Sequence, residues 1–408
     1  MTRMHSGFVV VTVLALTGCY TPERASREQL VVPAPKTWVA KAAETGDVEG
    51  DWWLRFQSPD LNTVVAQTLE RNPDLRAAEA RLAAAASLAR IAGADLYPTL
   101  GIDFAASRQR QVFVGFPIPT SGGVPSQTFN NFGVGLSTSW ELDIWGRIRA
   151  GHEAALADVL SSAESLRGLR HSLSAQAAKA WFAAVEARQQ LDLALRTVAS
   201  FTRTERQVAD RFARGVRPAL DVRLARVNLA GAEANQHLWE QQLAQATRQL
   251  EILQGRYPSG RSRIRHEMPP LPGPVPVGLP TEMLRRRPDL LALEHRLAAT
   301  GFRVEEAQAQ LYPRISLTSS AGTASDELSD LTDGDFFTWN VVGNFFQPLF
   351  QGGRLIAGVD LAAADEYEAL SNYASAVLSA YSEVEIVLAT EGYLAQRAKS
   401  LSRAATEA

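Results

Sequence analysis

The sequence STSWELDIWGRIRAGHEAAL, residues 137–156, changes its periodicity partway along. Up to Leu142, apolar and polar residues alternate, which is the period of a strand with one apolar face. From Arg147 onward the apolar residues recur three and four positions apart, which is the period of an amphipathic helix. No proline or Asn-Gly turn separates the two patterns, so the sequence predicts a strand that runs almost directly into a helix.

This arrangement occurs twice, because the chain contains an internal repeat. NPDL at 72–75 returns as RPDL at 287–290, and LYP at 96–98 returns at 311–313; both second copies lie 215 positions after the first. Each copy reads as a helix, a strand, a loop, a second strand and then a long helix. The strand-to-helix passage is therefore a regular feature of the predicted fold.

The chain divides into five predicted segments. They are a signal peptide over 1–18, a lipidated extended segment over 19–60, a first repeat over 61–255, a Pro/Gly-rich linker over 256–280 and a second repeat over 281–408. Within the first repeat we expect strands at about 99–109 and 132–142 and a long helical hairpin over 147–255. Within the second we expect strands at about 314–322 and 337–346 and a long helix from 353. The return helix of this second copy, with its gate residues, is expected beyond Ala408.

The first long helix carries a heptad seam, which is typical of helices that pack along their length. The seam keeps a 4,3,4,3 spacing through Leu173, Ala177, Ala180, Ala184, Ala187, Leu191, Ala194 and Val198. ARGVRPALDV at 213–222 then breaks the helix. Gly215 and Pro218 favour the turn, and Asp221 lies near the positive end of the next helix dipole.

The N-terminus resembles a bacterial lipoprotein signal. Arg3 and His5 precede an apolar run over 8–16 that is too short to span a bilayer. Cys19, the only cysteine of the chain, follows Leu-Thr-Gly as in a lipobox, and an intrachain disulfide is excluded. Tyr20, where an aspartate would indicate retention in the inner membrane, favours the outer membrane. The alternative is a cysteine that lies in the signal region by chance.

Composition and motifs do not favour an enzyme. With 41 basic and 44 acidic residues the net charge is -3, so no preference for nucleic acid is indicated. The sequence has no HExxH or paired-cysteine motif, and QGGRLIAG lacks the Lys-Ser/Thr of a phosphate loop. The acidic stretch DELSDLTDGD at 326–335 departs from the EF-hand spacing and is expected to be a solvated loop. We therefore expect no catalytic residues, no metal and no cofactor apart from a covalent lipid on Cys19.

One basic group stands out within the linker. It consists of Arg256, Arg261, Arg263 and Arg265 and has no interleaved aromatic residues. We interpret it as a solvated loop, with a partner-binding patch as the alternative.

The strand pattern indicates insertion into a membrane by several copies together. In the last strand Phe337, Trp339 and Val341 share one face, while Thr338 and Asn340 lie on the other. Four strands do not close a barrel alone, and an open edge is not tolerated in hydrocarbon. Two, three or four copies would supply 8, 12 or 16 strands, and spacing does not choose among them. The alternative is an ordinary sandwich with one wet face.

The two strand-to-helix junctions are candidate functional positions. We expect Trp145 to anchor at the membrane interface and the junction glycines to permit the change of backbone twist. The arginines that follow would satisfy carbonyls or acidic neighbours, or would be solvated charges in the first turn. The junction residues are Trp145, Gly146 and Arg147 in the first copy and Gly352, Gly353 and Arg354 in the second.

In combination these motifs resemble the TolC-like outer-membrane efflux proteins, most closely their lipoprotein (NodT-type) branch. The resemblance is carried by the lipobox at Cys19, DWWLRFQSPDLNTVVAQTLERNPDL, the two Tyr-Pro anchors, WELDIWGRIRA, RFARGVRPALDV and PLFQGGRLIAG. It implies a mixed α/β membrane protein: four transmembrane strands per protomer contribute to a trimeric 12-stranded β-barrel continuous with a long antiparallel α-helical periplasmic barrel.

The resemblance also implies a function and partners. The homotrimer would be lipid-anchored in the outer membrane and would dock a periplasmic adaptor and an inner-membrane RND-type transporter. It would passively conduct drugs or other small toxic compounds. The matching adaptor-docking tip is Arg214, Gly215, Pro218 and Asp221. A duct of a type I protein secretion system and a lipid-tethered periplasmic coiled-coil scaffold are the alternatives, and the sequence identifies neither the substrate nor the pump.

Overall fold

The computed structural model describes residues 35, 37–39, 50–114, 124–265, 267–273 and 278–407. The chain folds into two compact units. The described part of the first unit lies within Ala84–Ser161 and Leu293–Ala376, and that of the second within Pro33–Ala83, Ser162–Ala292 and Val377–Ala408. Each unit therefore draws segments from both sequence repeats.

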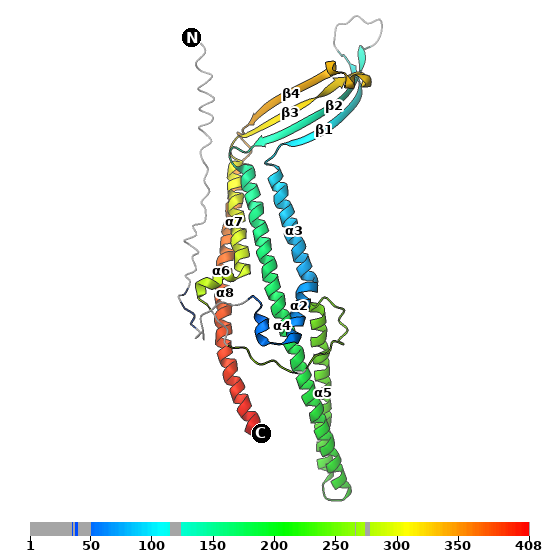
Figure 1. The fold of residues 1–408 in the computed structure, drawn as a ribbon, viewed down its shortest axis with the longest axis vertical. Helices are drawn as coiled ribbons and strands as arrows, with labels where there is room; N and C mark the ends of the chain where they lie inside the picture. The colour runs from blue at the N-terminus through cyan, green and yellow to red at the C-terminus, as the bar shows by residue number, and fades with distance from the viewer. Residues whose placement is uncertain are drawn as a thin grey trace. The chain divides into compact units, whose positions relative to one another are not determined.

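The first unit contains a single four-stranded antiparallel sheet with the strand order β1-β2-β3-β4 (Figure 1). Its strands are β1 (Thr99–Val112), β2 (Ser126–Leu142), β3 (Arg314–Ser325) and β4 (Phe337–Phe346). The two hairpins, one from each repeat, join because β2 pairs with β3 along eleven residues, from Phe132 opposite Ser325 to Leu142 opposite Ile315.

Three strands extend beyond their predicted ends, whereas β4 has the predicted bounds. β1 continues to Val112, β3 continues to Ser325, and β2 begins at Ser126 in a stretch that the sequence analysis assigned to a loop. The stretch 126–131 lacks apolar alternation, but it pairs with residues 107–112 of β1. Backbone pairing with a neighbour, which does not depend on side-chain polarity, lengthens the hairpin. The acidic stretch between β3 and β4 contains two short 3-10 helices, η3 (Leu328–Thr332) and η4 (Gly334–Phe336).

The remaining described elements are helical. They are η2 (Trp52–Phe56), α2 (Pro59–Arg71), α3 (Pro73–Ala94), α4 (Arg147–Ala213), α5 (Ala219–Leu253), α6 (Pro280–Arg286), α7 (Pro288–Ala309) and α8 (Arg354–Glu407). None of the helices in the described ranges combines the length and the apolar composition of a membrane-spanning helix.

Two predicted segment limits are wrong. The segment expected to be extended up to residue 60 includes η2 and the start of α2, because Ser58 accepts a hydrogen bond from the Leu61 N–H at 3.3 Å and Pro59 occupies the first helical position. The linker expected to end at residue 280 ends one residue earlier, since α6 begins at Pro280.

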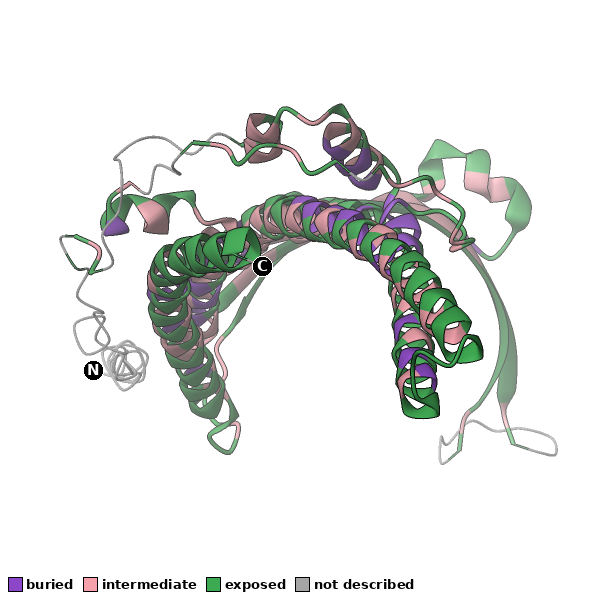
Figure 2. Ribbon diagram, turned by 90° about the horizontal axis from the view of Figure 1, so that it is seen from below, coloured by how far each residue is buried: buried purple, intermediate pink, exposed green. Residues whose placement is uncertain are grey.

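The core of the second unit forms where α2 and α5 pack on α4. Leu61 and Val65 of α2, Trp181 and Val185 of α4 and Leu250 of α5 are all buried and form one cluster. The heptad seam of α4 is also buried at Leu173, Ala177, Ala184, Ala187, Leu191 and Ala194. Figure 2 shows this buried stripe along the long helices, whose small residues permit close helix packing.

A buried carboxylate, Glu251, organises the loop that follows α5. Glu251 is 1% exposed. Its two oxygens accept hydrogen bonds from the hydroxyl of Ser259 (3.1 Å), the N–H of Gly260 (2.7 Å) and both the N–H (3.1 Å) and hydroxyl (2.8 Å) of Ser262. Burial raises the pKa of Glu251, but the Gly260 N–H and the Ser262 and Ser259 donors outweigh it and lower the pKa to about 2.

This loop carries the basic group noted in the sequence. Arg265 forms an ion pair with Asp60 at 3.2 Å, across an exposed surface. The hydrogen bonds to Glu251 and this ion pair thus attach the loop to α5 and α2. The partner-binding patch stays a prediction.

Candidate functional site

The sheet of the first unit has one apolar face. Register pairs Ile102 with Leu136, Leu136 with Ala321 and Ala321 with Trp339, so these four residues form one row across it. Rows above and below are also mostly apolar: Leu100, Phe104, Phe132, Val134, Trp140, Leu142, Ile315, Leu317, Phe337, Val341 and Phe345. Ile102 is 80% exposed and Trp339 is 71% exposed, so within one chain this face is uncovered. The edge strands β1 and β4 are exposed along their whole length, and Figure 2 shows much of the sheet as exposed.

The opposite face of the same sheet is polar and built from small side chains. Serine, threonine, glycine and asparagine dominate it: Thr99, Gly101, Gly133, Gly135, Ser137, Ser139, Ser316, Thr318, Ser320, Gly322, Thr338, Asn340 and Asn344. A depression on this face has a volume of about 500 Å³. The residues of the polar face that line it include Gly101, Ser137, Ser320 and Asn340. One sheet thus separates an apolar surface from a hydroxyl-lined one.

Both edges of the sheet are open within the described chain. β1 pairs with β2 alone, and β4 pairs with β3 alone. Each edge therefore presents a row of unpaired backbone N–H and C=O groups, which an apolar medium does not tolerate. Strand pairing with another chain would satisfy them.

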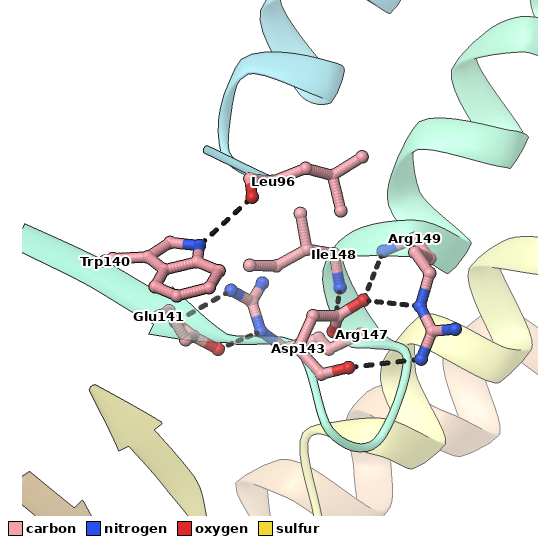
Figure 3. A network of polar contacts seen from close by, with 7 residues as sticks. All are labelled: Leu96, Trp140, Glu141, Asp143, Arg147, Ile148 and Arg149. Carbon is pink, nitrogen blue, oxygen red and sulfur yellow. Dashed lines mark hydrogen bonds and ion pairs between the residues drawn. The ribbon is translucent and has the colours of Figure 1, made fainter. Parts of the chain in front are cut away.

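The first strand-to-helix junction is held by ion pairs and hydrogen bonds (Figure 3). The Arg147 guanidinium donates to both oxygens of Glu141, at 3.1 and 3.0 Å, across the turn between β2 and α4. The Trp140 indole N–H donates to the carbonyl of Leu96 at 3.0 Å, which fixes the end of β2 against the start of β1. Arg147 thus has an acidic partner, one of the two roles expected for it.

Asp143 caps the first turn of α4. Its carboxylate accepts from the backbone N–H groups of Ile148 and Arg149, both at 2.9 Å, and from the Arg149 guanidinium at 3.1 Å. Partial burial raises the pKa of Asp143, but these N–H groups and the guanidinium lower it by more, so the pKa lies below its ordinary value. The negative charge also faces the positive end of the helix dipole.

Replacing Asp143 with alanine should loosen the start of α4. The loss of the cap should cost about 1 kcal/mol, because two amide groups lose their acceptor. Hydrogen exchange at the amides of residues 147–151 should then be faster in Asp143→Ala, while Asp143→Asn, which keeps one of the two acceptor oxygens, should have a smaller effect. Equal exchange in Asp143→Ala and the parent would show that the cap is not needed.

Trp145 and Gly146 form the turn itself. The Trp145 indole N–H donates to the carbonyl of Pro313 at 2.8 Å, and the indole stacks on Tyr312 with ring centroids 5.0 Å apart. Trp145 thereby connects the β2–α4 junction to the turn before β3. Gly146 has φ +77°, a conformation that favours glycine. The role of Trp145 as a membrane anchor stays a prediction.

The second junction is simpler. Gly352 and Gly353 have φ +59° and +81°, and Arg354 donates to the Gln351 side-chain oxygen at 3.1 and 2.6 Å. Arg354 thus lacks the acidic partner that Arg147 has among the described residues. When Arg354 is aligned with Arg147, Phe350 stands in the position of Asp143. The two junctions therefore share their glycines and arginines but not their carboxylates.

The predicted docking residues lie at the turn of the α4–α5 hairpin in the second unit. Gly215, with φ +75°, ends α4: its N–H donates to Phe212 O at 2.8 Å, and the Val216 N–H donates to Arg211 O at 2.9 Å. Pro218 immediately precedes the first residue of α5, Ala219. Asp221, in the first turn of α5, accepts from Arg217 at 3.2 Å. Arg214, Gly215 and Pro218 are exposed, and their docking role stays a prediction.

The structure thus places the predicted residues in separate groups. The two junctions belong to the first unit and the hairpin tip belongs to the second. Cys19 and the signal peptide lie outside the described residues. In the described ranges no cluster of His, Cys, Asp or Glu side chains is suited to hold a metal ion.

Glu141, Asp143 and Arg149 were not among the functional positions predicted from the sequence. Asp143 was recognisable, since aspartate shortly before a helix is a common capping residue. No comparable sequence signal marks Glu141, because the geometry of the turn is what brings it to its partner, Arg147.

Comparison with known proteins gives consistent matches. A family model described as outer membrane efflux protein matches residues 64–256 and 279–408. The chain is 32% identical over 401 residues to outer membrane protein OprJ of Pseudomonas aeruginosa, covering 96% of this chain and 82% of that protein. It is also 32% identical over 357 residues to the toluene efflux pump outer membrane protein TtgF of Pseudomonas putida, covering 88% of this chain and 73% of that protein.

A solved structure shares the fold. The open state of the MtrE outer membrane channel of Neisseria gonorrhoeae superposes with a TM-score of 0.73 at 28% identity, covering 91% of this chain and 84% of that chain. The match therefore includes most of both chains.

Proposed function

Because the chain belongs to the outer membrane efflux protein family, we propose that it is the outer-membrane channel component of a tripartite efflux pump. It passively conducts drugs or other small toxic compounds from a periplasmic adaptor and an inner-membrane transporter to the exterior. The channel itself performs no chemistry on its cargo.

The observation that carries this proposal is the two-faced sheet with open edges. Its apolar face suits lipid and its polar face suits a water-filled bore. Three copies would pair β1 of one protomer with β4 of the next and would close twelve strands without an edge. Because β2 and β4 each pass into a long helix, α4 and α8, the bore would continue beyond the membrane.

The height of the apolar band supports insertion. On β2 this band extends from Phe132 to Leu142, ten residue steps or about 34 Å along the strand. At a tilt of about 40° this corresponds to roughly 26 Å along the membrane normal, close to the apolar band of about 25 Å in outer-membrane barrels. The strand length therefore suits one crossing.

We further propose a lipid on Cys19 and an adaptor at the hairpin tip. The lipobox-like residues before Cys19 support the first. The exposed turn with Arg214, Gly215 and Pro218, together with the exposed apolar side chains of Val216 and Leu220, supports the second. Both attachments would hold the channel at the outer membrane and in line with its pump.

Cell fractionation and a sensitivity assay test this function. Full-length protein should be recovered from outer membranes as a heat-modifiable trimer. Deletion of the gene, in a strain that relies on this pump, should increase sensitivity to several dyes or antibiotics at least about fourfold. A freely dissolved monomer would contradict the proposal and favour the scaffold alternative. Loss of a secreted protein with unchanged drug sensitivity would indicate a secretion duct instead.

A further inference from the structure

The polar face of the sheet carries few charges, and one of them stands apart. On the described strands its ionisable side chains are Asp103 on β1, Glu141 on β2 and Arg314 on β3. Glu141 is paired with Arg147, and Arg314 is the first residue of its strand. Gly135 of β2 lies opposite Asp103 of β1 in the register. Along β2, Glu141 is six residues from Gly135, which corresponds to about 20 Å. Among the described strands, Asp103 is thus the charge of this face that lies away from the junction end, where Glu141 and Arg314 are placed.

Neighbouring glycines leave the Asp103 carboxylate uncovered. The register places Asp103, Gly135, Gly322 and Thr338 in one row. The carboxylate lies over Gly135, since a Cβ at Gly135 would be 3.5 Å from both Asp103 oxygens. Gly322 has no room for a side chain, because a Cβ there would lie 2.2 Å from the Val134 carbonyl oxygen. Asp103 is exposed and has no ion-pair partner among the described residues.

We infer that Asp103 is a specificity-determining residue that makes the bore prefer cationic over anionic solutes. This inference rests on the proposed function, because symmetry would place one Asp103 from each of three protomers at the same level. The three carboxylates would then form a negative ring, and the rest of their row, Gly135, Gly322 and Thr338, is uncharged.

The dimensions of a twelve-stranded barrel make such a ring effective. Strands 4.8 Å apart and tilted about 40° give a backbone radius of about 12 Å. Short inward side chains then leave an open radius of about 8 Å, similar to the Debye length of about 8 Å at physiological ionic strength. The ring would therefore act on a solute anywhere in the cross-section. At 1 M salt the Debye length falls to about 3 Å and the effect should largely vanish.

Ion permeability of purified trimers in planar bilayers tests the inference. With KCl gradients centred on 0.1 M, the parent should favour K⁺ over Cl⁻. Asp103→Asn should reduce this permeability ratio by about twofold or more, and Asp103→Glu should retain it. Asp103→Asn combined with Thr338→Asp, which returns a carboxylate to the same row, should restore the preference. In 1 M KCl all variants should converge.

Failure of the inference differs from failure of the channel function. A parent that conducts, but whose selectivity is unchanged by Asp103→Asn, would overturn the role of Asp103 and leave the duct intact. If Asp103→Asn does not assemble, Thr338→Lys in the parent should cancel the preference by neutralising the row, and an unchanged ratio would overturn the inference. A trimeric parent that never conducts would instead contradict the proposed function.

Discussion

Replacing Leu136 with arginine should remove the assembled protein from the outer membrane. Leu136 lies on the apolar face of a central strand, in the row with Ile102, Ala321 and Trp339, near the middle of the apolar band. An arginine facing lipid at this depth costs about 2–4 kcal/mol per chain, and three copies incur the cost three times. We expect at least a tenfold loss of heat-modifiable trimer in outer-membrane fractions.

Ser137→Arg is the matched control for this substitution. It introduces the same side chain one residue later on the same strand, but on the polar face next to Gly101. Its trimer yield should stay within about twofold of the parent because the guanidinium would remain in water. Equal losses in both variants would mean that the two faces of the sheet are not distinguished by lipid.

Glu251→Gln should destabilise the second unit strongly. The buried carboxylate accepts four hydrogen bonds from the loop 259–262, and an amide would turn an N–H₂ group toward some of these donors. The expected loss is about 3 kcal/mol in the free energy of unfolding, measured as a lower urea midpoint by tryptophan fluorescence. Trp181, 4% exposed in the core of this unit, reports the transition.

The pH dependence of this loss has a defined sign. The pKa of Glu251 is lowered from 4.5 to about 2. The stabilisation is therefore fully present above pH 4.5 and is lost as the pH falls toward 2. The difference in the free energy of unfolding between the parent and Glu251→Gln should be constant from pH 5 to 8 and should shrink below pH 4.5.

Glu240→Gln provides the control. Glu240 is an exposed carboxylate on α5 whose partners are Gln236 and His237. Its replacement should leave the urea midpoint close to that of the parent, because the interactions of an exposed carboxylate contribute little to stability. A loss as large as that of Glu251→Gln would assign the effect to the charge of α5 in general rather than to the buried carboxylate.

The parts of the fold that follow from local periodicity were predictable. The switch from period two to a helical period in residues 137–156 located both the end of β2 at Leu142 and the start of α4 at Arg147. The junction glycines were also predictable, because they lie where the strand period changes to the helix period. Gly146, Gly352 and Gly353 have the positive φ angles that such a sharp change of direction requires.

The parts that depend on partners distant in the sequence were not predictable. The start of β2 is polar and reads as a loop, and only its pairing with β1 makes it a strand. Glu251 looks like an ordinary helical glutamate, because the serines that bind it lie in a segment with the composition of a linker. The isolation of Asp103 likewise appears only when the register places glycines beside it.

A closed barrel requires β1 of one copy of this chain to pair with β4 of another copy, and engineered disulfides detect this pairing. Within one sheet these edges are three strand spacings apart, about 14 Å, whereas a disulfide needs Cα atoms within about 7 Å. A cross-link between β1 and β4 must therefore join two chains. Variants that carry only one of the two engineered cysteines control for cross-links through Cys19, the native cysteine.

Cysteines at Gly101 or Ala105 on β1 should be combined in turn with cysteines at Thr338, Asn340 or Asn344 on β4, and oxidised in outer membranes. At least one combination should give covalent dimers and trimers, with no larger species, on a non-reducing gel. Monomers from every combination, or a ladder that continues beyond three chains, would contradict a closed twelve-stranded barrel.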